Sequence, residues 1–352
     1  MKNLIKRRIG DMSLGLRRRR RVLLYLLGFF LPIGQISHAG AAGATLSNFA
    51  TSITSESMAV AWMAKERGFF QKYGLDVQTI QMPRSALTVT ALIAGEIDMA
   101  IIGPGHLLNA ATSGADVVGI ANFVQRLDYR FIGRSEIKKP EDLRGKRVAI
   151  SGPGAVSHVV ALLALQNLGL DPNREKITFL TIPGTEMNRR IALESMSVDA
   201  SALNGAVGDL YASRGYSMLF NFKGSGISLA QTALVTSRRT ITAKPQVVEG
   251  YLKAFIEAIA YLLEPANKAV VTRVIASNLR LEPPAAEEAY QAVVNSYDRI
   301  PYPNVEGIRR LQSILVQVNP KLSTVRAETV VDGGLISRLE ASGFIKGLYK
   351  KP

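Results

Sequence analysis

The sequence contains no cysteine, and only three of its 352 residues are histidine. The absence of cysteine excludes disulfide bonds, a thiolate metal site, a cysteine nucleophile and lipid attachment at cysteine. Three histidines, His38, His106 and His158, are too few to suggest a multi-histidine metal site. Low-complexity tracts are also missing, and the 47% hydrophobic content is that of an ordinary globular protein. We therefore expect no metal and no cofactor, and enough apolar residues for two α/β cores.

The chain carries a formal net charge of +15, but much of this surplus lies at its beginning. Residues 1–21 hold nine lysines and arginines and a single acid, Asp11. The remaining excess is spread along the chain without a basic stripe, which argues against nucleic acid as a partner. A modest positive field would still favour anionic ligands.

The basic block is followed by an apolar run over Val22–Gly34 and by small residues over Ser37–Ala42. This order is typical of a secretory signal, and cleavage is expected after Ala39 or Ala42. We interpret residues 1–39 as the signal peptide. The alternative is an uncleaved anchor that would hold a sensor domain at the membrane. Against it, an apolar core of about 15 residues spans only ~22 Å as a helix, less than the ~30 Å hydrocarbon layer.

Strand-like and helix-like segments alternate through the first half of the chain, a pattern typical of a parallel sheet with crossover helices. The predicted helices include Met58–Lys72 and His106–Ser113. Beyond a predicted strand at Gln231–Thr236, the pattern becomes mostly helical, from Gln246 to about Glu340.

This order predicts that the chain leaves one lobe, builds a second and returns to the first. The predicted first lobe comprises residues 40–125 and 230–352, and the second comprises residues 126–229. Extended hinge segments are expected at about Arg126–Arg134 and Ser228–Thr236.

An apolar strand-like run ends in Gly-Pro-Gly twice, at Gly103–Gly105 and at Gly152–Gly154, and a helix-like run follows each time. Such junctions are where open α/β sheets bind ligands, because glycine lets the backbone approach closely and the helix N–H groups point outward. We predict that the two corners meet across a cleft and that their backbone amides donate hydrogen bonds to a ligand.

Three stretches carry a resemblance to a known family. Trp62–Val77 contains Gly-Phe-Phe and then Gly-Leu-Asp-Val, Leu92–Ala100 contains Ala-Gly-Glu-Ile-Asp, and Asp142–Ala149 reads Asp-Leu-Arg-Gly-Lys-Arg-Val-Ala. Together they resemble, in the right order over roughly residues 45–345, the nitrate/sulfonate/taurine family of ABC-transporter solute-binding proteins. The resemblance implies an α/β fold of the type II periplasmic-binding-protein class, with two lobes of parallel-type sheets joined by two hinge strands. It also implies a periplasmic monomer that works with an ABC permease in the inner membrane.

Candidate ligand groups follow the predicted strands. Ser151, Gly154 and Ser157 lie at the start of the second-lobe helix, where free amides and the helix dipole favour an anion, although helix capping would explain them as well. His106 and His158 could face each other across the cleft, or simply pack inside the core. Arg84 precedes a helix, where a cation opposes the helix dipole and so hints at an anionic partner. The complete predicted ligand-binding set is Ser52, Arg84, Ser85, Gly103, His106, Ser151, Gly154, Ser157, His158, Thr185, Asn204 and Gln231.

These observations predict a binding protein, not an enzyme, that closes on a small anionic organic solute such as a sulfonate, nitrate, a carboxylate or a pyrimidine-like compound. Glu186 would argue mildly against a strongly anionic ligand if its side chain faces inward. The alternatives are an enzyme on the same fold, such as a pyrimidine synthase or a lyase, and a membrane-anchored sensor. The pyrimidine-synthase branch depends on a cysteine-rich iron motif, which this chain lacks.

Overall fold

The computed structural model describes residues 44–183, 186–223 and 225–349. The predicted signal peptide and Thr185 therefore lie outside the described residues. Within the described ranges, no helix is both long enough and apolar enough to span a bilayer.

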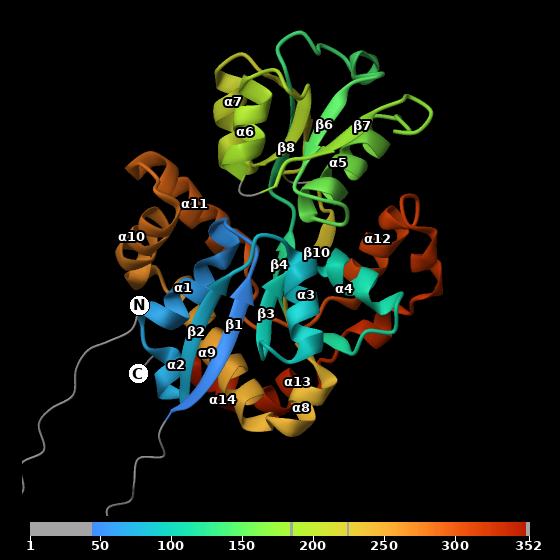
Figure 1. Ribbon diagram of the computed structural model, residues 1–352. Helices are drawn as coiled ribbons and strands as arrows, with labels where there is room; N and C mark the ends of the chain where they lie inside the picture. The colour runs from blue at the N-terminus through green and yellow to red at the C-terminus, as the bar shows by residue number, and fades with distance from the viewer. Residues whose placement is uncertain (1–43, 184–185, 224, 350–352) are drawn as a thin grey trace, which may run out of the picture. The chain divides into compact units, whose positions relative to one another are not determined.

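The strands form two five-stranded sheets, which define the two lobes used below (Figure 1). In the first sheet, of order β2-β1-β3-β10-β4, β1 runs parallel to β2 and β3, whereas β10 is antiparallel to β3 and β4. Its strands are β1 (Thr45–Thr51), β2 (Leu75–Gln81), β3 (Met99–Ile102), β4 (Val117–Arg126) and β10 (Ser228–Ser237).

The second sheet, of order β7-β6-β8-β5-β9, repeats this plan, with β5 antiparallel to β8 and β9. Its strands are β5 (Tyr129–Gly133), β6 (Arg147–Ile150), β7 (Thr178–Thr181), β8 (Ala200–Asn204) and β9 (Ser217–Asn221). The sequence pattern predicted the parallel strands, but not that β5 and β10, the strands that follow each crossing between lobes, run antiparallel. It also missed β9, whose alternation is weak because its side chains are half-buried or exposed.

The chain crosses between the lobes twice. It passes from β4 to β5 through Leu127 and Asp128, and it returns from β9 to β10 through residues 222–227. The segments predicted as hinges are thus largely strands β5 and β10, each belonging to one sheet.

Helices pack against both faces of each sheet, and further helices pack on those (Figure 1). They are α1 (Ala59–Glu66), α2 (Phe69–Lys72), α3 (Ser85–Ala94), α4 (Pro104–Ala111), α5 (Val156–Asn167), α6 (Glu186–Glu194), α7 (Gly205–Ser213), α8 (Arg238–Ala243), α9 (Pro245–Leu263), α10 (Lys268–Leu279), α11 (Pro283–Ser296), α12 (Val305–Leu315), α13 (Gly334–Ala341) and α14 (Phe344–Leu348). Short 3₁₀ turns are η1 (Glu56–Met58), η2 (Pro140–Leu143), η3 (Pro265–Asn267), η4 (Pro320–Thr324) and η5 (Ala327–Val330).

Two of the predicted helices differ from the structure. The helix expected over Met58–Lys72 is broken at Gly68, whose φ of 67° lies in the left-handed region and separates α1 from α2. The helix expected from His106 begins two residues earlier, at Pro104, because the fixed φ of proline suits the first helical position.

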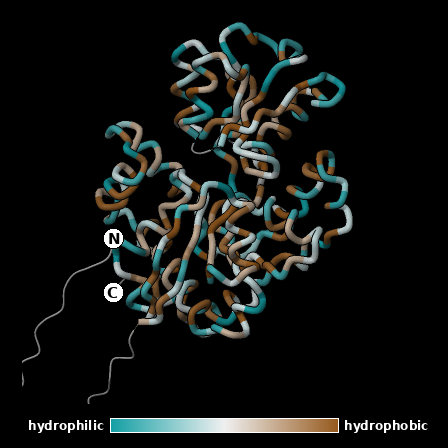
Figure 2. The backbone as a smooth tube through the Cα atoms, in the orientation of Figure 1, coloured by the Kyte–Doolittle hydropathy of each residue, from teal (hydrophilic) through white to brown (hydrophobic). Residues whose placement is uncertain are grey.

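Strand alternation in the first sheet divides its core between two faces. Phe49 packs with Tyr251 and Phe255 of α9 on one face, whereas the next residue, Ala50, belongs to the cluster with Leu107 of α4 on the other. Figure 2 shows apolar residues running along the strands of both sheets. Because β1 and β3 run parallel, their carboxyl ends lie at the same edge of the sheet.

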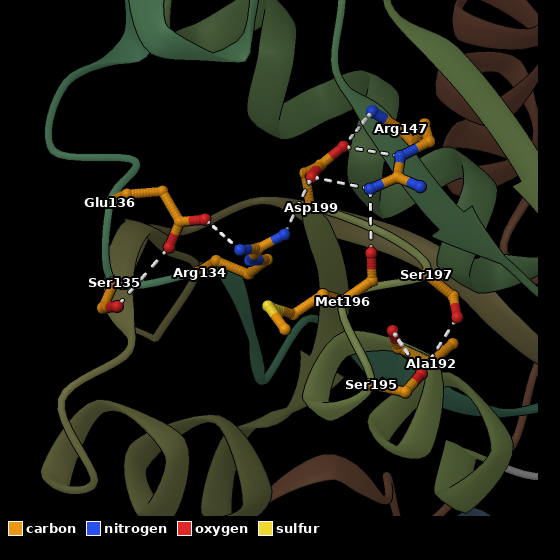
Figure 3. Close-up of polar contacts among 9 residues, drawn as sticks. All are labelled: Arg134, Ser135, Glu136, Arg147, Ala192, Ser195, Met196, Ser197 and Asp199. Atoms are coloured by element: carbon orange, nitrogen blue, oxygen red, sulfur yellow. Dashed lines mark hydrogen bonds and ion pairs between the residues drawn. The ribbon is translucent and has the colours of Figure 1, made fainter.

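An aspartate fixes the opposite, amino-terminal end of the central parallel strand in each lobe. Asp98, before β3, accepts hydrogen bonds from Ser47 Oγ at 2.7 Å and Lys244 Nζ at 2.6 Å. Asp199, before β8, accepts from the backbone N and Nε of Arg147, both at 2.9 Å (Figure 3). These contacts lie at the amino-terminal ends of β3 and β8, so they do not occupy the carboxyl ends, where the cavity lies.

Candidate functional site

A cavity of about 790 Å³ lies between the lobes, at the carboxyl ends of the strands. In the first lobe it is lined by segments that follow β1, β2 and β3, and in the second lobe by segments that follow β6, β7 and β8. Open α/β sheets bind ligands in this kind of crevice, because loops and helix N-termini converge there. A volume of several hundred Å³ suits a small molecule.

The two Gly-Pro-Gly corners touch, as the sequence predicted. A β-carbon placed on Gly105 would lie 2.2 Å from the carbonyl oxygen of Gly154, and one placed on Gly154 would lie 2.8 Å from Asn109 Nδ2. Only glycine permits this approach between the lobes. Gly105 and Gly154 therefore pack against each other instead of lining the cavity.

Nine residues of the predicted ligand-binding set line the cavity: Ser52, Arg84, Ser85, Gly103, His106, Ser151, Ser157, Asn204 and Gln231. Contact of these residues with a solute stays a prediction. Ser52 and Ser85 are joined by a hydrogen bond of 2.5 Å, and Gln231 donates to the carbonyl of Arg126. Burial lowers the pKa of His106 to about 4, so this side chain is neutral at physiological pH.

Gly154 and His158, also in the predicted set, do not line the cavity in this structure. His158 is 3% exposed, its Nδ1 accepts a hydrogen bond from the Gly154 amide at 3.1 Å, and its ring packs edge-on against Phe179. Burial lowers its pKa to about 4. The histidine therefore supports the Gly-Pro-Gly turn from behind and is not charged at neutral pH.

The second-lobe wall contains an arginine that is absent from the set predicted from the sequence. Arg189 of α6 is 6% exposed, and its NH1 donates to Ser151 Oγ at 2.7 Å. Its Nε is buried and has no hydrogen-bond partner among the described residues. A buried donor without a partner is costly, so this guanidinium is suited to an acceptor that enters the cavity.

The start of α5 adds further donors beside Arg189. Ser157 Oγ accepts from the Ser151 amide at 2.8 Å and lies 2.9 Å from Ser151 Oγ. The first amide of the helix with a backbone partner is that of His158, which bonds to Ala155. The amides of Val156 and Ser157 have no backbone partner among the described residues. These groups and Arg189 make one donor-rich wall that fits an anion.

Three carboxylates also line the cavity: Glu56 from the first lobe, Asp128 from the crossing segment and Glu186 from α6. Glu186 lies 3.7 Å from Arg189 NH2 and accepts from the Asn204 amide at 2.9 Å. Asn204 Nδ2 also donates to Glu56 Oε2 at 3.2 Å, across the cleft. Burial, followed by the charge of Glu186, raises the pKa of Glu56 to about 7.

The lining thus combines three arginines, Arg84, Arg126 and Arg189, with the three carboxylates. Groups of both signs make the cavity polar, and Glu56, with its pKa raised to about 7, is only partly ionised at neutral pH. Among the described residues, no cluster of histidine, aspartate or glutamate has the arrangement of a metal site.

The sequence pattern that describes the NMT1/THI5-like proteins matches residues 55–269, more than half of the chain. The chain belongs to the NMT1/THI5-like family. The matched range covers η1 through α9 and so includes most of the cavity lining.

Other comparisons connect this NMT1/THI5-like chain with binding proteins. A relative from Brucella abortus, named as a binding protein, is 31% identical over 141 residues, which cover 40% of this chain and 42% of the relative. The chain thus matches less than half of that relative's length.

Two solved structures show the same fold. A protein from Bordetella bronchiseptica RB50 has a TM-score of 0.72 at 17% identity, covering 86% of this chain and 98% of its own. The alkanesulfonate-binding protein SsuA from Xanthomonas axonopodis pv. citri, bound to MOPS, has a TM-score of 0.66 at 21% identity, covering 83% and 99%. The predicted periplasmic-binding-protein fold is therefore confirmed.

Two cavity residues of this NMT1/THI5-like chain, Arg189 and Glu56, escaped prediction for different reasons. Arg189 stands next to Arg190 on a helix of low hydrophobicity, where charges are usually solvated. Its position one turn after the loop that follows β7 was the signal that could have found it. Glu56 lies in a polar stretch before α1, and only the folded chain brings it to Asn204.

Proposed function

We propose that this protein is the periplasmic solute-binding component of an ABC importer and that its lobes close on a small organic solute carrying a single anionic group. It would act as a monomer without a cofactor and would deliver the solute to a permease. Membership of the family, the name of the Brucella relative and the two-lobed fold with a cavity between the lobes support this proposal. Because the SsuA protein of the same fold is an alkanesulfonate-binding protein, sulfonates are reasonable first compounds to test.

The observation that carries the proposal is the donor-rich wall of the second lobe. Arg189 offers a buried Nε without a partner among the described residues, and Ser151, Ser157 and the first amides of α5 surround it. A sulfonate or carboxylate oxygen placed there would accept charge-assisted hydrogen bonds, each worth about 1.5–3 kcal/mol. The dipole of α5 alone would contribute only ~0.3–1 kcal/mol.

The carboxylates limit the charge of the solute. A second anionic group would meet Glu56, Asp128 or Glu186 on the same cavity surface. Like charges in a shielded site repel strongly, so a dianion would bind less well than a monoanion of similar size.

The test is a thermal-shift screen of the mature protein with alkanesulfonates, carboxylates, nitrate and pyrimidines. A solute present at 100 times its Kd should stabilise the folded state by about 2.7 kcal/mol. With the responding solute, Arg189→Ala should weaken binding by roughly tenfold to a hundredfold. Arg174→Ala is the matched control, because Arg174 is exposed and pairs with Glu175 outside the cavity.

Failure of every compound to shift the melting temperature would contradict solute binding of this class. Equal affinity of Arg189→Ala and the control would contradict the placement of the anion. Mass spectrometry of the solute after incubation tests the enzyme alternative, which predicts a changed compound. The intact mass of the exported protein tests the sensor alternative, which predicts that residues 1–39 are retained.

A further inference from the structure

Asn204 donates a hydrogen bond to one carboxylate from each lobe. Its backbone amide donates to Glu186 Oε2 at 2.9 Å within the second lobe. Its side-chain Nδ2 donates to Glu56 Oε2 at 3.2 Å, and Glu56 belongs to the first lobe. Two acidic groups from opposite sides of the cleft are therefore brought to one residue when the lobes meet.

The side chain of Asn204 makes this contact instead of a local one. Asn204 is the N-cap of α7, a position where asparagine usually accepts a hydrogen bond from the first turn of the helix. Among the described residues its side chain makes no capping hydrogen bond, and its Nδ2 instead donates across the cleft to Glu56. The bond between the lobes thus replaces a capping interaction.

Among the described residues, no cation forms an ion pair with Glu56 or is among the groups that shift its pKa. The groups that act on it most are the carboxylates of Glu186 and Asp128 and its own backbone amide. The positive charges of α6, Arg189 and Arg190, act on Glu186 instead. Glu56 also acts on the phenols of Tyr129 and Tyr297, whose pKa values burial raises, so both stay neutral.

We propose that closure of the lobes is coupled to the uptake of one proton by Glu56. In the closed form the protonated carboxyl of Glu56 and the side chain of Glu186 both accept hydrogen bonds from Asn204, and the proton returns to solvent when the lobes separate. The inference rests on the proposed function, in which the lobes close on a solute, and it makes that closure depend on pH. Because solute would be released when the cleft opens, retention would be stronger in mildly acidic surroundings.

The direction of the pH dependence follows from the raised pKa of Glu56. In this structure, where Glu56 meets Asn204 of the second lobe, burial and then the charge of Glu186 raise its pKa from an ordinary 4.5 to about 7. Separation of the lobes would move Glu186 away and let water reach Glu56, so its pKa should fall back toward 4.5. Below about pH 4.5 both forms are protonated. Between about 4.5 and 7 only the closed form keeps the proton, so rising pH lowers the ratio of closed to open molecules by up to about tenfold per pH unit. Above about pH 7 the ratio no longer changes through this group.

The absence of cysteine makes the test direct, since two introduced thiols can be labelled without background. Ser113→Cys in the first lobe and Asn173→Cys in the second place fluorophores at exposed positions outside the cavity. Single-molecule energy transfer between them reports the closed fraction from pH 5 to pH 8, without any solute. The result therefore does not depend on whether the solute screen succeeds.

We expect the closed fraction of the parent protein to fall as the pH rises toward 7, and Glu56→Gln to abolish this dependence. Glu186→Gln should move the midpoint to lower pH, because it removes the charge that helps hold the proton on Glu56. Glu141→Gln, at an exposed second-lobe position outside the cavity, should titrate like the parent. A parent protein with no pH dependence, or an unchanged dependence in Glu56→Gln, overturns the proposal.

Discussion

The backbone of Gly105 in the first lobe lies against the carbonyl of Gly154 in the second, so closely that a β-carbon on Gly105 would be 2.2 Å from that oxygen. The contact joins the two corners where a strand of each lobe turns toward a helix. Near it, α12 packs against both α4 of its own lobe and α5 of the other. The corners thus form one boundary of the cavity.

Replacing Gly105 by alanine should force the lobes apart at this contact. The atom in the way belongs to the backbone, so it cannot rotate aside, and overpacking of this kind costs about 1–3 kcal/mol. We expect lower stability in urea and weaker solute binding. Gly347→Ala is the control, because nothing lies within 4 Å of its added carbon and Gly347 is exposed outside the cavity. Equal behaviour of the two variants would show that the contact is not needed.

His158 should govern part of the acid sensitivity of the fold. Its pKa is lowered to about 4 from an ordinary value of 6.5, so the neutral form is the one that the folded state holds. Its stabilisation is complete above about pH 6.5 and is lost as the pH falls toward 4, by up to about 3 kcal/mol.

In His158→Gln, the free energy of unfolding should therefore decline less between pH 6.5 and 4 than in the parent protein. Urea denaturation at several pH values measures this difference. An identical pH profile in both proteins would show that another group, such as His106, carries the effect.

Asp199→Asn should destabilise the second lobe. Hydrogen bonds from Arg147 hold the pKa of Asp199 below its ordinary value, so this stabilisation is present at neutral pH and is lost as the pH falls below about 4. Removal of the charge should cost about 1–3 kcal/mol at pH 7, measured by urea unfolding. Glu141→Gln, at an exposed position, should cost almost nothing. A neutral effect of Asp199→Asn would mean that the strand end needs no charged partner.

Arg130→Lys should weaken the junction between the crossing segment and the second lobe. Arg130 is 1% exposed, pairs with both oxygens of Asp209 at 2.7 and 2.8 Å, and bonds to Asp128 at 2.7 Å. A lysine keeps the charge but cannot reproduce this fork, and because Asp209 and Asp128 are 49% and 40% exposed, we expect the lost hydrogen bonds to cost about 1–3 kcal/mol.

The melting temperature of Arg130→Lys should fall by several degrees, and solute binding should weaken because Asp128 lines the cavity. Arg174→Lys serves as the exposed control. Unchanged melting of Arg130→Lys would show that the fork contributes little.

The sequence by itself was enough for the fold class, the family resemblance and the meeting of the Gly-Pro-Gly corners. These features depend on local signals: the alternation of strand and helix patterns, the short motifs of the family, and glycine at turns that end strands. The same rule explains eight of the nine predicted site residues that line the cavity, since these eight end or follow a strand or stand in the first turn of a helix, whereas Gln231 lies within β10.

Only the tertiary structure decided the directions of β5 and β10, the burial of His158 and the positions of Arg189 and Glu56 in the cavity. Strands β5 and β10 run antiparallel because each enters its sheet after the chain has crossed between the lobes. The local periodicity of the sequence carries no information on that crossing. Likewise, a charge on a helix has the same local pattern whether it faces water or a cavity. The approach of Glu56 to Asn204, 148 residues apart in the chain, exists only once both lobes have folded and met.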